Sequence, residues 1–230
     1  MKSYREVFSK KHTLLVVIHV EGGVQALRNA RIAANEGVDG VFLINHHIPY
    51  VSLLECAAYI RNRVPRLWIG VNCLGLGAGA VEVIPKNMQG LWVDNAMIEE
   101  SAKDPVLGAR GFSWKRKDVG WEGLYFGGVA FKYQAPVTDL ARVARLAMPF
   151  VDVITTSGPG TDKPADVGKI RTMKQAIGNH PLAIASGIRP ENVREYMPYT
   201  DCFLVASGIS DSHTELNPAK VRALVKVLRS

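Results

Sequence analysis

The sequence has only three cysteines and no long hydrophobic run. Cys56, Cys73 and Cys202 lie far apart without C-x-x-C spacing, which favours free thiols over disulfides or a zinc site. No apolar stretch reaches the length of a membrane-spanning helix, about 18 residues, and the run TLLVVIHV at 13–20 has the length of a strand with no cleavage site after it. We therefore expect a cytosolic protein without a transmembrane segment.

Motifs for nucleotides and metals are also missing. The stretch GLGAGA at 75–80 lacks the G-x-G-x-x-G spacing of a dinucleotide-binding turn, so a tight turn is the simpler interpretation. A metal site from His19, His47 and Asp94 is conceivable, but no H-x-H or H-E-x-x-H spacing supports it. We expect neither a metal nor a cofactor.

Positively charged residues are distributed along most of the sequence. The net charge of +7 suits anionic ligands, but it is spread out except for SKKH at 9–12 and RGFSWKRK at 110–117. No nucleic-acid motif surrounds these clusters, and solvated surface charge is the simpler interpretation. We expect no nucleic-acid partner.

Apolar residues, in contrast, are abundant. They make up 47% of the 230 residues, which is ample for a sizeable core, and they form eight short strand-like runs that begin at 13, 38, 66, 88, 124, 151, 181 and 201. Their near-continuous apolarity is typical of parallel strands buried on both faces. Amphipathic segments separate them, and the last has Asn217 as a helix N-cap and Pro218 at the first helical position.

Eight strand-then-helix units predict a fold. Over residues 1–230 they indicate a single-domain α/β protein, a (β/α)8 TIM barrel, with a doubly wound open sheet as the alternative. The only long connection, about 96–123, follows the fourth strand on the face where barrels carry their active sites. It is either a lid or a surface excursion.

Polar residues follow the strands, where a barrel places its catalytic groups. We expect Asp94, Lys132, His47 and Asn72 to be catalytic, and His19, Asn45 and Thr156 to line the same pocket. Side-chain alternation turns Lys132 and Asn72 into the barrel mouth and separates His46 from His47, so that at most one of these histidines lines the pocket. Asp94 and Lys132 suit proton transfer, and a purely structural ion pair is the alternative.

Ala-Ser-Gly-Ile occurs twice, at 185–188 and 206–209, each time after a strand. The loops after the last two strands are where barrels commonly bind phosphate, and glycine lets backbone N–H groups approach an anion. We expect Ser186, Gly187, Ser207 and Gly208 to bind phosphate, with Gly158 and Gly160 on the rim. The alternative is that these small residues only allow close packing.

These motifs resemble a known family. The segments IGVNCLG, GLWVDN, GVAFKYQ and DVITTSGPGTD, followed by PLAIASGIRPEN and FLVASGI, are similar to the BtpA/SgcQ family of predicted TIM-barrel proteins. More broadly they resemble the ribulose-phosphate binding barrels. The resemblance implies a phosphate site at the last two strands and, from the BtpA name, a role in photosystem assembly.

Two functions follow from these observations. The first is an enzyme for a small phosphorylated metabolite, a sugar phosphate or phosphoribosyl compound, with isomerase or lyase acid/base chemistry. The alternative is a non-catalytic assembly or biogenesis factor of BtpA type, whose basic segment at 110–123 contacts a protein or membrane surface. Barrels of this kind often dimerise, so a homodimer is a further expectation.

Overall fold

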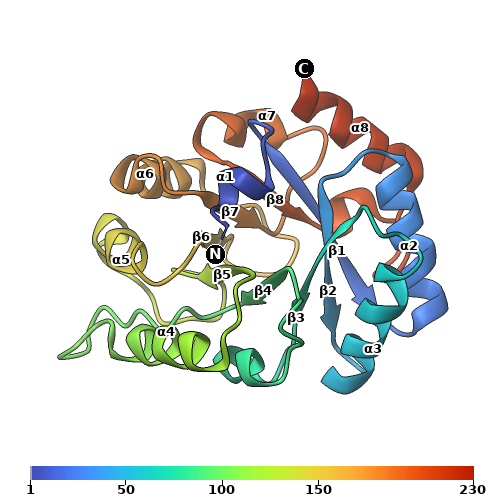
Figure 1. Cartoon of the computed structure of the whole chain (residues 1–230). Coiled ribbons are helices and arrows are strands. Elements are labelled where there is room, and N and C mark those ends of the chain that lie inside the picture. Colours follow the sequence, from blue (N-terminus) through green and yellow to red (C-terminus); the bar gives the residue numbers. More distant parts are fainter. Residues whose placement is uncertain (1) are drawn as a thin grey trace.

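The computed structural model describes residues 2–230, and its eight parallel strands close into a barrel surrounded by helices (Figure 1). The strands are β1 Thr13–Val20, β2 Gly40–Asn45, β3 Trp68–Asn72, β4 Gly90–Val93, β5 Leu124–Gly128, β6 Val153–Ser157, β7 Leu182–Ala185 and β8 Cys202–Val205. Each strand pairs with the next, and β8 pairs with β1, where Thr13 lies beside Cys202. The predicted barrel is confirmed, and the open sheet is excluded because its edge strands would be unpaired.

Helices connect most of the strands. They are α1 Tyr4–Val7, α2 Gly23–Asn35, α3 Tyr50–Arg61, α4 Leu107–Val119, α5 Leu140–Ala147, α6 Val167–Ile177, α7 Val193–Tyr196 and α8 Pro218–Arg229, with short 3-10 helices η1 Gly77–Glu82, η2 Met197–Tyr199 and η3 Ser207–Ile209. The predicted cap of α8 is confirmed, since the Asn217 side chain accepts a hydrogen bond from the Lys220 N–H. The regular alternation fails after β3, where the glycine-rich segment forms only η1. In residues 2–230 we find no helix long and apolar enough to span a membrane.

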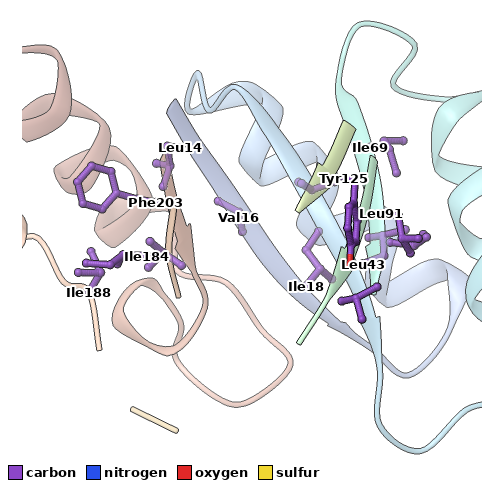
Figure 2. Close-up of a cluster of buried hydrophobic side chains, with 14 of the residues drawn as sticks. Leu14, Val16, Ile18, Leu43, Ile69, Leu91, Tyr125, Ile184, Ile188 and Phe203 are labelled. Carbon is purple, nitrogen blue, oxygen red and sulfur yellow. The ribbon is translucent and has the colours of Figure 1, made fainter. Parts of the chain in front are cut away.

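The strands separate two apolar layers. Along β1, Leu15 and Val17 pack inside the barrel, whereas Leu14, Val16 and Ile18 pack outward against the helices. Figure 2 shows these three outward side chains within the outer layer. This alternation determines which side chain at each strand end faces the barrel mouth.

Aromatic rings fill the barrel interior. The Phe42 ring packs edge-on to Phe126, with ring centroids 5.0 Å apart, and to Trp68 at 5.2 Å. A Cβ at Gly70 would collide with the Phe42 ring, so this glycine makes the aromatic packing geometrically feasible. Phe8, just after α1, packs on Trp68 and helps close the amino-terminal end of the barrel. The carboxyl-terminal end is left for a site.

The segment 96–123 is not one continuous loop, which corrects part of that prediction, and only residues 94–106 form a loop between β4 and α4. Residues Leu107–Val119 form α4, the crossover helix of the fourth unit. Phe112 stacks on Tyr125 of β5 with ring centroids 4.1 Å apart, and the largely buried Arg116 pairs with Asp152, with Nη2 and Oδ2 2.8 Å apart. The sequence concealed this helix because its exposed face is rich in charge and glycine.

Candidate active site

A cavity of about 310 Å³ lies at the carboxyl-terminal ends of the strands. Asp94, Lys132 and the two Ser-Gly pairs all line it. A larger cavity, about 820 Å³, lies at the opposite end, beside Tyr4, Arg116 and His180. We place the candidate site in the smaller cavity because active sites of (β/α)8 barrels lie at the carboxyl-terminal face, whatever the relative volumes.

Asp94 follows β4 and is held by Asn72. The amide Nδ2 of Asn72 donates to Oδ1 of Asp94 over 2.9 Å. Burial raises the pKa of the Asp94 carboxyl above its ordinary value, and the Asn72 hydrogen bond and the Lys132 charge offset part of this rise. A partly desolvated carboxyl in a cavity is suited to take and return a proton. Asn72, expected to be catalytic, contacts Asp94 but does not itself line the cavity.

Lys132 does line the cavity, although strand alternation is not the reason. Strand β5 ends at Gly128, and the following loop turns through left-handed conformations at Ala130 (φ 47°) and Tyr133 (φ 65°). The Lys132 N–H donates to Ser157 Oγ over 2.7 Å, and Nζ lies 3.3 Å from Thr161 Oγ1. Within residues 2–230 Lys132 makes no salt bridge to Asp94, so the alternative of a structural ion pair is not observed.

Lys169 supports this loop and was missed by the sequence analysis. Its Nζ donates to the carbonyl oxygens of Ala130 (2.5 Å) and Ser157 (2.8 Å), so it joins the β5 loop to the end of β6. Burial lowers the pKa of Lys169 to about 8. No sequence signal separates it from a surface lysine, because its two acceptors are backbone atoms of other units.

The doubled Ser-Gly-Ile brings two loops together at the cavity. Ser186, Gly187, Ser207 and Gly208 all line it. A Cβ at Gly208 would collide with the carbonyl oxygen of Ile188, and one at Gly187 (φ 68°) would collide with the backbone of Pro164. Close packing, the alternative left open by the sequence, therefore explains both glycines, and their presence alone does not indicate phosphate.

Asp162 introduces a carboxylate beside these loops. Its Oδ1 accepts a hydrogen bond from Ser207 Oγ, and both residues line the cavity. Asp162 (φ 60°) and Ser186 (φ 97°) also adopt left-handed backbone conformations. Strained backbone is retained where the surrounding structure enforces it, and such positions cluster at functional sites.

Asn45 and Thr156 lie outside the cavity, contrary to expectation. Asn45 continues the outward face of β2, where Nδ2 donates to Ile48 O (2.9 Å) and Oδ1 accepts from the Leu74 N–H (2.9 Å). Thr156 is fully buried and donates to Ala130 O over 3.2 Å. Both side chains brace turns, because alternation directs them away from the barrel axis.

Gly158 and Gly160 do not line the cavity either. Gly158 borders a separate pocket with Lys169, and a Cβ there would collide with the carbonyl oxygen of Lys163. Gly160 is buried in the same loop. The loop after β6 instead contributes Thr161 and Asp162 to the cavity.

The cavity contains His46 rather than His47, which corrects another prediction. His46 continues the inward face of Phe42 and Ile44, whereas His47 is exposed outside the cavity. Both faces of β2 are apolar, so the sequence did not show which was inward.

His46 lies beside His19 and His213. The sequence analysis did not identify His213 as a site residue. The ring centroids of His19 and His213 are 4.0 Å apart, those of His19 and His46 are 4.9 Å apart, and those of His46 and His213 are 5.4 Å apart. One nitrogen from each ring lies within 4.8 Å of the other two, so this cluster has the donors that a metal requires. The cluster considered from sequence, His19 with His47 and Asp94, does not form among residues 2–230.

Comparison with known proteins supports the fold more than the family. No protein-family model matches the chain, so the resemblance to the BtpA/SgcQ family stays a prediction. The chain is 26% identical to the uncharacterized protein TK2179 of Thermococcus kodakarensis, over 89% of this chain and 85% of that protein.

Solved structures share the barrel. Phosphoribosyl anthranilate isomerase from Thermus thermophilus superposes with a TM-score of 0.67 at 15% identity, covering 94% of this chain and 98% of that one. (S)-3-O-geranylgeranylglyceryl phosphate synthase from Thermoplasma acidophilum, in complex with its substrate sn-glycerol-1-phosphate, superposes with a TM-score of 0.67 at 14% identity, covering 99% of both chains. At this identity the similarity shows a common fold.

Proposed function

We propose that this chain is an enzyme that acts on a small phosphorylated metabolite, a sugar phosphate or phosphoribosyl compound, by isomerase or lyase acid/base chemistry. The observation that carries the proposal is the single cavity that contains Asp94, Lys132 and the loops after β7 and β8. Those loops are the common phosphate site of (β/α)8 barrels. The names of both structural neighbours described above include a phosphorylated compound.

The phosphate would lie between the two Ser-Gly loops. In residues 2–230 the N–H groups of Gly187 and Ile188 make none of the backbone hydrogen bonds found in turns and loops, so they are available to an anion. The hydroxyl of Ser207 is a further donor once Asp162 turns away. The Lys132 ammonium, in the same cavity, adds positive charge.

Asp94 and Lys132 would then divide the chemistry. The Asp94 carboxylate takes a proton from a carbon next to a carbonyl group and returns it elsewhere on the substrate. The Lys132 ammonium stabilises the negative charge that develops on the carbonyl oxygen. Asn72 keeps the carboxyl oriented through its hydrogen bond.

A thermal-unfolding screen tests the binding step. Inorganic phosphate, ribose and ribulose phosphates, and nucleotides are each added to the protein, and we expect one compound to raise Tm by several degrees because it binds only the folded state. Lys132→Ala should remove this rise, whereas Lys103→Ala, at an exposed loop position, should keep it. No rise with any phosphorylated compound would overturn the proposal.

Turnover of the compound so identified tests the chemistry. Asp94→Asn and Lys132→Ala should each lower kcat by a factor of about 100 or more, the usual range for a lost acid/base group. Asn72→Ala should lower kcat less, because it acts only through Asp94. If Asp94→Asn retains full turnover, our assignment of the proton-transfer group is wrong.

The exposed surface around Trp114 favours a second candidate function, that of a non-catalytic assembly factor. It is 66% exposed on α4, beside the exposed Lys115 and Lys117, so aromatic surface and positive charge lie together. If this function holds, the chain should sediment with vesicles that contain anionic lipid, and Trp114→Ala should abolish the effect. Equal sedimentation of wild type and Trp114→Ala would remove this candidate.

A further inference from the structure

Three histidines from both ends of the chain meet at the barrel mouth. His19 ends the inward face of β1, His46 follows β2, and His213 lies in the loop between η3 and α8. Because β1 pairs with both β2 and β8, closure of the barrel makes these three positions neighbours. All three side chains line the candidate active-site cavity.

His19 has an unsatisfied nitrogen in this cluster. Among residues 2–230, Nδ1 of His19 is buried and has no hydrogen-bond partner. Buried polar atoms in native structures nearly always have a partner, and an exception indicates a missing water or ion. A cation bound at the cluster would coordinate one nitrogen of the His19 ring, so that only the other nitrogen would need a hydrogen-bond partner.

The pKa values of two of these rings are lowered. Burial, together with the neighbouring His213 and His46, lowers the pKa of His19 to about 3. Burial also lowers the pKa of His46.

Side chains of α2 form hydrogen bonds with the backbone around the cluster. Gln25 Nε2 donates to the carbonyl oxygens of His19 (3.2 Å) and Thr214 (2.6 Å), so one side chain joins two of the histidine-bearing segments. The buried Asn29 donates to Thr214 O over 2.7 Å and accepts from the Leu216 N–H over 3.0 Å. These hydrogen bonds hold the loop that carries His213 close to the end of β1.

Charges of both signs lie around the cluster. Asp162 lies near enough to His19 to raise its pKa, and Asp94 lines the same cavity. Lys132 acts in the opposite direction on His19. The case for a cation therefore comes from the three clustered rings and from the unpartnered Nδ1 of His19.

We propose that His19, His46 and His213 bind a divalent transition-metal ion of the zinc type, with a coordination position open to the cavity. Imidazole ligands suit Zn²⁺, Fe²⁺, Ni²⁺ and Cu²⁺, and three histidines plus one open position are typical of catalytic zinc. Bond lengths of about 2.0–2.1 Å require nitrogens about 3.4 Å apart. His46 and His213 are exposed, so their rings can turn inward from the separations of up to 4.8 Å seen here.

This inference goes beyond the proposed function and does not depend on it. An open metal position beside Asp94 and Lys132 would accept an oxygen of any substrate, with or without a phosphate group. The site also needs residues from β1, β2 and the β8 loop that the phosphate proposal does not use.

Metal titration of chelator-treated protein tests the proposal. We expect one equivalent of Zn²⁺ to bind by calorimetry and one equivalent of Co²⁺ to give the visible absorption band of a four- or five-coordinate site. His46→Ala and His213→Ala should each weaken binding at least tenfold, whereas His47→Ala, the exposed neighbour, should bind as the wild type does. Gln25→Ala should weaken binding less than these two variants, because Gln25 contacts the backbone oxygens of His19 and Thr214 and no ligand ring.

Two results would overturn it. One is the absence of stoichiometric binding by wild-type protein that retains its thermal unfolding transition. The other is binding that persists unchanged in both His46→Ala and His213→Ala, which would place the ion elsewhere. No phosphorylated compound is present in these titrations, so their failure is distinct from failure of the ligand screen.

Discussion

At the residue scale, Asp162 places a carboxylate where we propose that a phosphate binds. Its hydrogen bond with Ser207 must break before that hydroxyl can donate to an anion. Asp162→Asn removes the like charge, and we expect it to tighten phosphate binding about fivefold, equivalent to ~1 kcal/mol for an exposed charge.

Calorimetric titration with inorganic phosphate measures this effect. Asp118→Asn makes the same charge change at an exposed position of α4 and should leave the affinity unchanged. Weaker binding by Asp162→Asn would mean that the carboxylate assists the ligand rather than excludes it.

Lys169 gives a prediction about pH. Its pKa is lowered to about 8 in the folded chain, whereas an unfolded lysine titrates near 10.4. Between these values the unfolded state binds more protons, so the contribution of Lys169 to the free energy of unfolding rises with pH. The free energy of unfolding of the wild type minus that of Lys169→Met should therefore rise from about pH 8 to about pH 10.

Urea unfolding at several pH values measures this difference. Below about pH 7 it should be constant, because Lys169 is charged in both states. Lys117→Met, at an exposed position, provides the comparison and should show no pH-dependent difference. A constant difference for Lys169→Met across the whole range would contradict the assigned burial.

At the scale of elements, close approach of the loops after β7 and β8 depends on Gly208. A Cβ at this position would collide with the carbonyl oxygen of Ile188, and backbone cannot yield as a flexible side chain does. We expect Gly208→Ala to lower the free energy of unfolding by about 1–3 kcal/mol, the usual cost of overpacking. Denaturant unfolding gives the value directly.

Gly111 is the matched control for this substitution. It lies inside α4, and a Cβ there would meet no atom within 4 Å. Gly111→Ala should stabilise the protein by about 0.5–1 kcal/mol because alanine is the better helix former. If both variants behave alike, the contact at Gly208 is not what limits that position.

At the scale of the whole molecule, α1 and the residue after it close the barrel. Tyr4 Oη lies 2.7 Å from Thr13 Oγ1 and donates to Asp201 O over 3.0 Å, so the helix bridges the starts of β1 and β8. Phe8 is 5% exposed and packs on Trp68. Phe8→Ala should lower the free energy of unfolding by about 3–5 kcal/mol, the range for a buried aromatic residue.

Urea unfolding followed by tryptophan fluorescence measures this loss. Val24→Ala, at a residue that is 74% exposed, should change stability by less than about 0.5 kcal/mol. A small decrease in the free energy of unfolding for Phe8→Ala would show that the amino-terminal end of the barrel is stable without the Phe8 ring.

Sequence periodicity was enough for the barrel but not for the site. The eight runs and the cap at Asn217 depend on neighbours in the chain, so local patterns predicted them. The same patterns hid α4, and they selected His47 over His46 because β2 is apolar on both faces. Lys132 lines the cavity as predicted, yet a left-handed loop orients it rather than strand alternation.

The sequence by itself determined the strands, most of the helices and the end of the barrel where polar groups gather. Only the tertiary structure decided which of those groups share one cavity, because pairing of β1 with β8 brings His213 to His19 and His46. Lys169 likewise gains its role only when α6 packs against the β5 loop. Such contacts join residues far apart in the chain, and no local spacing encodes them.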